Sequence, residues 1–82
     1  MNDNFKYEIK KEIAVLSQYQ DETKEINYIS YNDREPKLDI RKWTKQPDGT
    51  KKMGKGITLS LQETQVLYKV LGEHLDGLPE LR

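Results

Sequence analysis

The hydrophobic period of this chain changes at Ser60, and that change limits the folds it can adopt. Before Ser60, apolar and polar residues alternate over several segments, which is typical of strands with one buried face. From Ser60 onward, the run Ser-Leu-Gln-Glu matches the capping box that opens a helix. An apolar stripe at helical spacing follows, made of Leu67, Val70, Leu71 and Leu75. We therefore expect strands followed by one helix.

Four segments show the strand pattern, at about residues 5–16, 25–32, 37–44 and 55–59. The helix is expected over about 61–76. We expect the polar run 17–24 to be a hairpin loop, and Pro47-Asp48-Gly49 to form a turn within a flexible, basic connection. The predicted fold class is α+β, with the order β-β-β-β-α and the helix covering one face of an antiparallel sheet.

The chain is short enough that a second copy is expected. Its 82 residues allow one domain, 1–82, in which 34% of residues are hydrophobic and 34% are charged. A single copy buries little surface, and no cysteine is present to staple it or to hold a structural metal. We therefore expect a homodimer, because association is the remaining common way to enlarge the core.

Nothing in the sequence predicts a membrane or secretory protein. The N-terminal residues show no apolar run of the kind found in a signal peptide. The longest apolar run, 13–16, is far too short to span a bilayer. The absence of cysteine fits a reducing compartment. We expect a cytoplasmic protein without a membrane partner.

The charge is unevenly distributed along a chain that is neutral overall. Residues 37–55 contain seven cations and two anions, a local charge of +5, and the remainder carries −5. A basic segment of this kind is compatible with a polyanion site on one face, and also with a solvated charged loop.

The sequence does not indicate an enzyme. The single histidine, His74, lies on the expected helix, and no cysteine accompanies it. Gly54-Lys55-Gly56 lacks the spacing of a phosphate loop and precedes a strand. We expect no catalytic residue, metal, cofactor or small-molecule substrate. The helix is also too acidic to read a DNA major groove.

The segment KLDIRKW, residues 37–43, provides the candidate site. Leu38 and Ile40 share one face of the expected strand, and Lys37, Arg41 and Trp43 share the other. Aromatic rings with interleaved cations suit single-stranded nucleic acid, because unstacked bases lie on the rings and cations follow the phosphates. Packing of Trp43 over a loop or in a dimer contact remains an equal alternative. The neighbouring strand adds either Tyr28 or Tyr31, since a bulge would exchange them.

Two motifs in fixed order give the chain a family resemblance. PKLDIRKW, the Pro-Asp-Gly loop, MGKGITLS and the helix resemble the single-stranded-DNA-binding domain of the transcriptional positive cofactor four family. The similarity is greater to its bacterial, YdbC-like branch and extends over nearly the whole chain. The resemblance implies a homodimer of curved sheets that bind single-stranded DNA with little sequence preference. It implies that the C-terminal helices hold much of the dimer.

The resemblance also assigns roles to individual residues. Arg41 and Lys55 match cations that contact DNA in the family, Lys37 matches the lysine before Asp-Ile-Arg, and Trp43 matches the aromatic after it. Tyr31 replaces a tryptophan of the bacterial branch. Thr44 stands where the eukaryotic branch has a further aromatic. Lys45, Lys51 and Lys52 add charge, and Leu67, Val70, Leu71 and Leu75 are expected in the core and the dimer contact.

Two other functions remain open at this point. Single-stranded RNA could bind the same surface, because nothing in the sequence reveals a reader of the 2′-hydroxyl. A protein-interaction module without nucleic acid would use Trp43 as an anchor. So much charge at the centre of a protein interface is unusual, which disfavours the second alternative.

Overall fold

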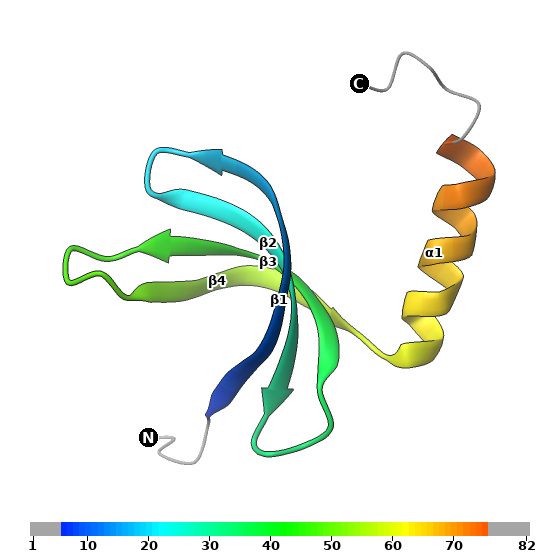
Figure 1. The fold of residues 1–82 in the computed structure, drawn as a ribbon, viewed down its shortest axis with the longest axis horizontal. Helices are drawn as coiled ribbons and strands as arrows, with labels where there is room; N and C mark the ends of the chain where they lie inside the picture. The colour runs from blue at the N-terminus through cyan, green and yellow to red at the C-terminus, as the bar shows by residue number, and fades with distance from the viewer. Residues whose placement is uncertain (1–5, 76–82) are drawn as a thin grey trace.

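The computed structural model describes residues 6–75, which form four strands and one helix. The strands are β1 (Tyr7–Tyr19), β2 (Glu22–Tyr31), β3 (Lys37–Lys45) and β4 (Lys51–Leu59), and the helix is α1 (Leu61–Leu75). The strands form one antiparallel sheet in the order β1-β2-β3-β4. Figure 1 shows an open, strongly bent sheet with the helix at its side. The predicted order and fold class are confirmed. The first and last residues expected in elements, 5 and 76, lie outside the described range.

The first hairpin is longer and tighter than predicted. Residues 17–24 are not a loop, because strand pairing continues through Ser17↔Lys24 and Tyr19↔Glu22. Only Gln20 and Asp21 form the turn, and Gln20 adopts a positive φ of 56°. The local sequence is polar because this end of the hairpin faces water. Cross-strand pairing holds these residues in strand conformation, which the side-chain pattern alone did not predict.

The second connection, between β2 and β3, is a rigid turn. Asn32 and Asp33 adopt φ of 54° and 64°, a conformation that Asn and Asp tolerate better than other residues with side chains. The Arg34 N–H donates to the Tyr31 carbonyl at 3.0 Å, which closes the turn. The Ser30 hydroxyl donates to the Arg34 carbonyl at 2.6 Å. Arg34 is therefore held by its backbone on both sides.

The third connection confirms the Pro-Asp-Gly prediction but not the flexible connection around it. Gly49 has a φ of 92°, and its N–H donates to the Gln46 carbonyl at 3.0 Å. The Gln46 N–H donates to the Thr50 carbonyl at 2.7 Å. Strand β4 begins directly afterwards at Lys51, four residues before the expected start. The turn geometry sets the two strands in register, which is why the lysines at 51 and 52 are in a strand.

The sheet has an inner face and an outer face, defined here by the alternation along β3. The inner face holds Asp39, Arg41 and Trp43, and the outer face holds Leu38, Ile40, Lys42 and Thr44. The most buried side chains are on the inner face: Trp43, Ile29, Asn27 and Asp39. Three register shifts in β1 help to bend the sheet around that face. The small core therefore lies inside the bend of the sheet, not under the helix.

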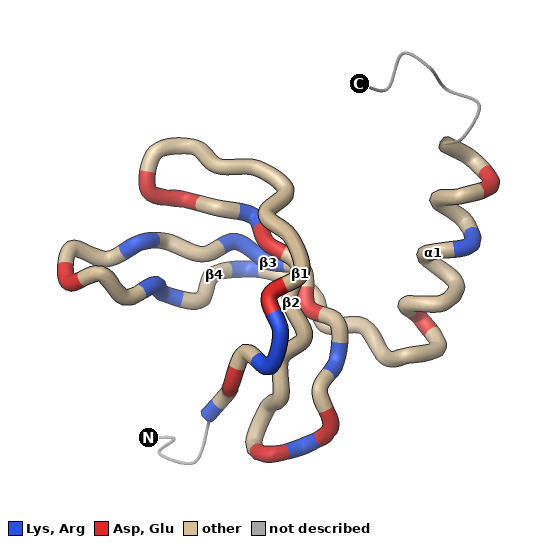
Figure 2. Tube along the Cα trace, in the orientation of Figure 1, with Lys and Arg blue, Asp and Glu red and all other residues tan. Residues whose placement is uncertain are grey.

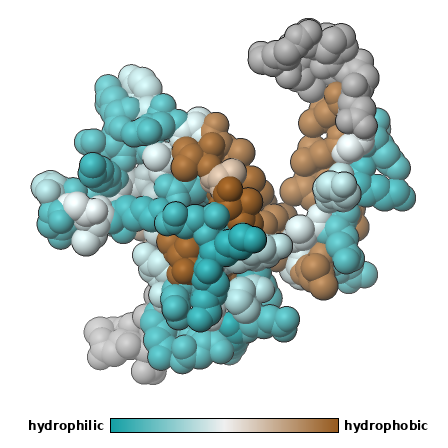
Figure 3. All heavy atoms as spheres, viewed as in Figure 1, coloured by the Kyte–Doolittle hydropathy of each residue, from teal (hydrophilic) through white to brown (hydrophobic). Residues whose placement is uncertain are grey.

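The helix begins as predicted but does not cover the sheet. The Glu63 N–H donates to Ser60 Oγ at 3.1 Å, and the Ser60 N–H donates to Glu63 Oε1 at 2.9 Å, completing the capping box. No described helix residue is buried. Figure 3 shows α1 standing apart from the sheet, with apolar side chains turned toward the gap. Leu67, Val70, Leu71 and Leu75 therefore do not form a buried core within one chain, and their place in a dimer contact stays a prediction. Leu67 is half-buried and the other three are exposed.

Candidate nucleic-acid interface

Asp39 and Arg41 form the centre of a hydrogen-bonded cluster on the inner face. Arg41 donates from Nε and Nη2 to the two carboxylate oxygens of Asp39, each at 2.7 Å. The Tyr31 hydroxyl and the Thr58 hydroxyl also donate to Asp39, at 2.7 and 2.9 Å. Asp39 is fully buried, so these four donors satisfy a carboxylate that has no access to water. Arg41 is thereby fixed in one orientation.

The same contacts set the pKa of both partners. Burial alone would raise the pKa of Asp39, but hydrogen bonds from Arg41, Tyr31 and Thr58 outweigh it and hold the pKa below its ordinary value. The hydrogen bond with Asp39 raises the pKa of Arg41. Both groups are therefore charged at neutral pH. Tyr31 lies on this face with Arg41, whereas Tyr28 pairs with Leu38 on the outer face.

Trp43 is buried on the inner face, which corrects the expectation of an exposed ring. Its exposed fraction is 1%. The Tyr7 ring lies 5.8 Å away at a tilt of 55°, and Lys51 Nζ lies 4.7 Å above the indole. Lys51 is itself bound to Glu25 at 2.7 Å. No base can lie on Trp43 in this arrangement, and sequence parity could not reveal it because parity does not say which face curls inward.

Glu25 stays ionised beneath Lys51. Burial alone would raise the pKa of Glu25, but hydrogen bonds from Lys51, Thr23 and Asn27 lower it overall. The carboxylate therefore keeps Lys51 on the inner face. Lys51 is thus occupied by an internal ion pair, and the prediction that it adds free charge to the surface is corrected.

A hollow at the end of the inner face gathers three of the predicted residues. This rim hollow, of about 390 Å³, is lined by Tyr31, Arg34, Glu35, Lys37, Arg41, Met53 and Thr58. Sequence reasoning found Tyr31, Lys37 and Arg41 but missed Arg34. A signal was available, because Arg34 directly follows the Asn-Asp turn that leads into the Lys37 strand. Three cations and one carboxylate meet here.

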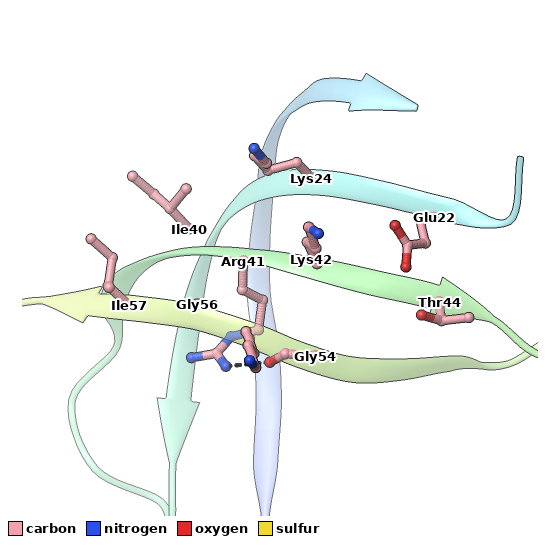
Figure 4. A pocket seen from close by; sticks show the side chains of 10 residues that line it. Glu22, Lys24, Ile40, Arg41, Lys42, Thr44, Gly54, Gly56 and Ile57 are labelled. Carbon is pink, nitrogen blue, oxygen red and sulfur yellow. Dashed lines mark hydrogen bonds between the residues drawn. The ribbon is translucent and has the colours of Figure 1, made fainter. Parts of the chain in front are cut away.

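A second hollow lies on the outer face, over the paired strands β3 and β4. This outer hollow, of about 630 Å³, is lined by Glu22, Lys24, Ile40, Arg41, Lys42, Thr44, Gly54, Lys55, Gly56 and Ile57. Figure 4 shows Lys24 and Lys42 on the same side of the sheet as Ile40 and Ile57, with Arg41 on the opposite side. The prediction included Lys55 but missed Lys24 and Lys42, which share the outward parity of Ile40. Arg41 borders both hollows.

The two glycines of the MGKGITLS motif are required by the close approach of β4 to β3. A Cβ at Gly56 would lie 2.5 Å from the Ile40 carbonyl oxygen, and one at Gly54 would lie 2.9 Å from the Lys42 carbonyl oxygen. The Gly54 carbonyl also accepts a hydrogen bond from Arg41 Nη1 at 2.8 Å. The register shift between Arg41 and Trp43 places an extra β4 residue here. The glycines thus let β4 come close enough for the Gly54 carbonyl to hold Arg41, and they carry no side chains beside it.

The remaining lysines of the sheet are available for a ligand. Figure 2 shows cations along β3 and β4, with acidic residues mostly near the turns. Within residues 6–75, no carboxylate is in ion-pairing distance of any of the following exposed lysines: Lys24, Lys37, Lys42, Lys45, Lys52 and Lys55. The buried acids Asp39 and Glu25 are already paired with Arg41 and Lys51. The exposed charge on this part of the sheet is therefore predominantly positive.

Basic hollows on an open sheet are compatible with a polyanion ligand. Comparison with known families gives the class of protein: residues 19–70 match the family Transcriptional Coactivator p15 (PC4). The chain belongs to this family, which confirms the resemblance to positive cofactor four. The family is known for single-stranded-DNA binding and a coactivator role, and it is non-enzymatic.

A bacterial relative supports the same assignment. An uncharacterized protein of Treponema pallidum (strain Nichols) is 40% identical over 72 residues, which span 87% of this chain and 81% of the relative. This is consistent with the bacterial, YdbC-like branch. Among residues 6–75, no helix is long and apolar enough to cross a bilayer.

Proposed function

We propose that this protein binds single-stranded DNA with little sequence preference, through the basic surface on both sides of β3 and β4. The observation that supports it is the separation of charges on the sheet. The acids Asp39 and Glu25 form internal ion pairs with Arg41 and Lys51. Lys24, Lys42 and Lys55 are exposed and have no ion-pair partner within the described chain. Such lysines gain free energy by replacing counterions along a phosphate backbone.

The two hollows suggest how a strand would run. Arg41 borders both of them, and Gly54 and Gly56 line the outer hollow without side chains. In this proposal the strand passes from the outer hollow over the glycines to the rim hollow, where Arg34 and Lys37 meet the next phosphates. Lys45 and Lys52 extend the charge toward the β3–β4 turn.

The aromatic roles differ from those expected from the sequence. Trp43 supports the surface from inside, because its ring is covered by Tyr7 and Lys51. Tyr31 is half-buried and lines the rim hollow, so part of its ring is available to a base there. A duplex hides its base faces, so a surface on which bases stack favours single strands.

Removal of the outer lysines tests the proposal. The double variant Lys42→Gln, Lys55→Gln should bind a fluorescein-labelled oligo-dT more weakly than the parent at low salt. The slope of log K against log salt should become shallower by roughly 0.7 for each lost phosphate contact. Lys10→Gln is the control, because Lys10 is bound to Glu8 on β1 and lies in neither hollow. An unchanged slope in the double variant would contradict this use of the outer face, and a matched RNA oligomer tests the preference for DNA.

We also infer a homodimer, in which the exposed apolar surface is covered by a second copy. The apolar side chains Val66, Val70, Leu71 and Leu75 of α1 are all at least two-fifths exposed. A contiguous apolar surface of this kind marks an interaction site in a soluble protein. Sedimentation equilibrium should give twice the mass of one chain, and Leu71→Lys should shift it toward one chain. A parent that remains a single chain at high micromolar concentration would contradict the dimer.

A further inference from the structure

We propose that Tyr19, at the end of β1, is the ring on which a DNA base stacks beside the outer hollow. This inference rests on the proposed binding of single-stranded DNA and adds a contact that sequence reasoning did not identify. Tyr19 is 72% exposed. Trp43 is buried and Tyr31 is half-buried with its hydroxyl bonded to Asp39, so neither offers a fully open ring.

Strand pairing places Tyr19 on the outer face. Tyr19 pairs with Glu22, Glu22 pairs with Thr44, and Thr44 pairs with Lys52. Residues directly opposite one another in antiparallel strands point to the same side of a sheet. Thr44 lines the outer hollow, so Tyr19 stands two strands away in the same row, roughly 10 Å distant.

A small hollow joins Tyr19 to the lysines of the outer face. This hollow, of about 170 Å³, is lined by Ser17, Tyr19, Glu22, Thr23, Lys24 and Lys42. Lys24 and Lys42 also line the outer hollow, so the two spaces share their cations. An exposed ring beside two unpaired lysines is the combination by which single strands are bound: the base lies on the ring and the lysines meet the flanking phosphates.

The charges of the row favour a base at Tyr19 over a phosphate. Glu22 lies between Tyr19 and Thr44, and its carboxylate would repel a phosphate placed there. The nearest cations, Lys24 and Lys42, lie in the next row toward the helix end of the sheet. Tyr68 is also highly exposed, at 82%, but it lies on α1 and lines neither basic hollow. Among the described tyrosines, Tyr19 thus combines exposure with adjacent positive charge.

The test compares Tyr19→Ala and Tyr19→Phe with the parent on two oligomers of equal length, oligo-dT and an abasic version of the same backbone. Tyr19→Ala should bind oligo-dT about tenfold more weakly, a typical loss for one stacked base. Tyr19→Phe should bind like the parent, because stacking needs the ring and not the hydroxyl. On the abasic oligomer all three proteins should bind alike.

The outcomes separate the two proposals. If the parent binds oligo-dT at low salt and Tyr19→Ala binds equally well, the stacking inference is wrong and the proposed function stands. If Tyr19→Ala is weakened by the same factor on the abasic oligomer, the loss does not come from stacking and the inference is again wrong. If the parent binds neither oligomer, the proposed function fails and this inference fails with it. Thermal melts of the variants confirm that the hairpin still folds.

Discussion

Gly56→Ala is expected to lower the free energy of unfolding by about 3 kcal/mol, the upper part of the usual range for overpacking. The new methyl group would lie 2.5 Å from the Ile40 carbonyl oxygen and 2.6 Å from the Arg41 Cα, and closer still to the Arg41 Cβ. All of these atoms belong to or adjoin the β3 backbone, so no flexible side chain can move aside. Strands β3 and β4 would have to separate where Arg41 is held by the Gly54 carbonyl.

The measurement is a thermal melt followed by circular dichroism. For a domain of this size, the expected loss corresponds to a fall in Tm of roughly 12–24 °C. Gly72→Ala is the matched control, since a Cβ at Gly72 meets nothing within 4 Å in the described chain and alanine favours the helix. A Gly56→Ala protein that melts with the parent would show that β4 does not approach β3 as described.

Asp39→Asn is expected to cost about 3–5 kcal/mol, the range measured when one partner of a buried ion pair is removed. The carboxylate accepts from Arg41, Tyr31 and Thr58, and an amide cannot accept at both of its positions. The Arg41 guanidinium would also lose its partner while its side chain is 13% exposed. Urea denaturation at pH 7 should show this loss, and Asp21→Asn, in an exposed turn, should stay within about 0.5 kcal/mol of the parent.

The same pair gives stability a dependence on pH. The folded-state pKa of Asp39 lies below its ordinary value of 3.8, so the unfolded chain takes up a proton at this site first as the pH falls. The contribution of Asp39 is therefore fully present above about pH 5 and is lost as the pH drops through the folded-state pKa. Glu25, whose pKa is lowered from 4.5, acts in the same direction. Asp39→Asn should lose stability less steeply below pH 4 than the parent. An equally steep loss would contradict this role.

The order of elements could be predicted because the decisive signals are local. The capping box at Ser60 and the turn at Pro47-Asp48-Gly49 depend on neighbours in the chain, and both appear as expected. The boundaries of the hairpins could not be predicted in the same way. Residues 17–24 and 51–54 become strand through cross-strand pairing, which a polar side-chain pattern does not reveal.

Several cations that line the two hollows were named from the sequence, but the burial of the Trp43 ring was not predicted. Alternation along β3 correctly grouped Arg41 with Trp43, but the bend of the sheet and the Tyr7 contact decide that this face is the interior. Lys51 meets the buried carboxylate of Glu25, which is 26 residues away, so this pairing depends on tertiary structure. Arg41 pairs with Asp39 only two residues earlier, and the fold determines that this pair is buried. Arg34 and Lys24 join the basic hollows for the same reason. Alternation along a strand shows which residues share a face, but only the folded structure shows whether that face is buried.

The most direct test of the account is the binding of the parent protein to oligo-dT over a series of salt concentrations, followed by fluorescence anisotropy. Five contacting cations, Arg34, Lys37, Lys24, Lys42 and Lys55, would give a slope of log K against log salt of about −3.5. We predict binding at low salt, a slope near this value, and much weaker binding to a duplex of the same length. No binding to oligo-dT at low salt, or equal affinity for the duplex, would contradict it.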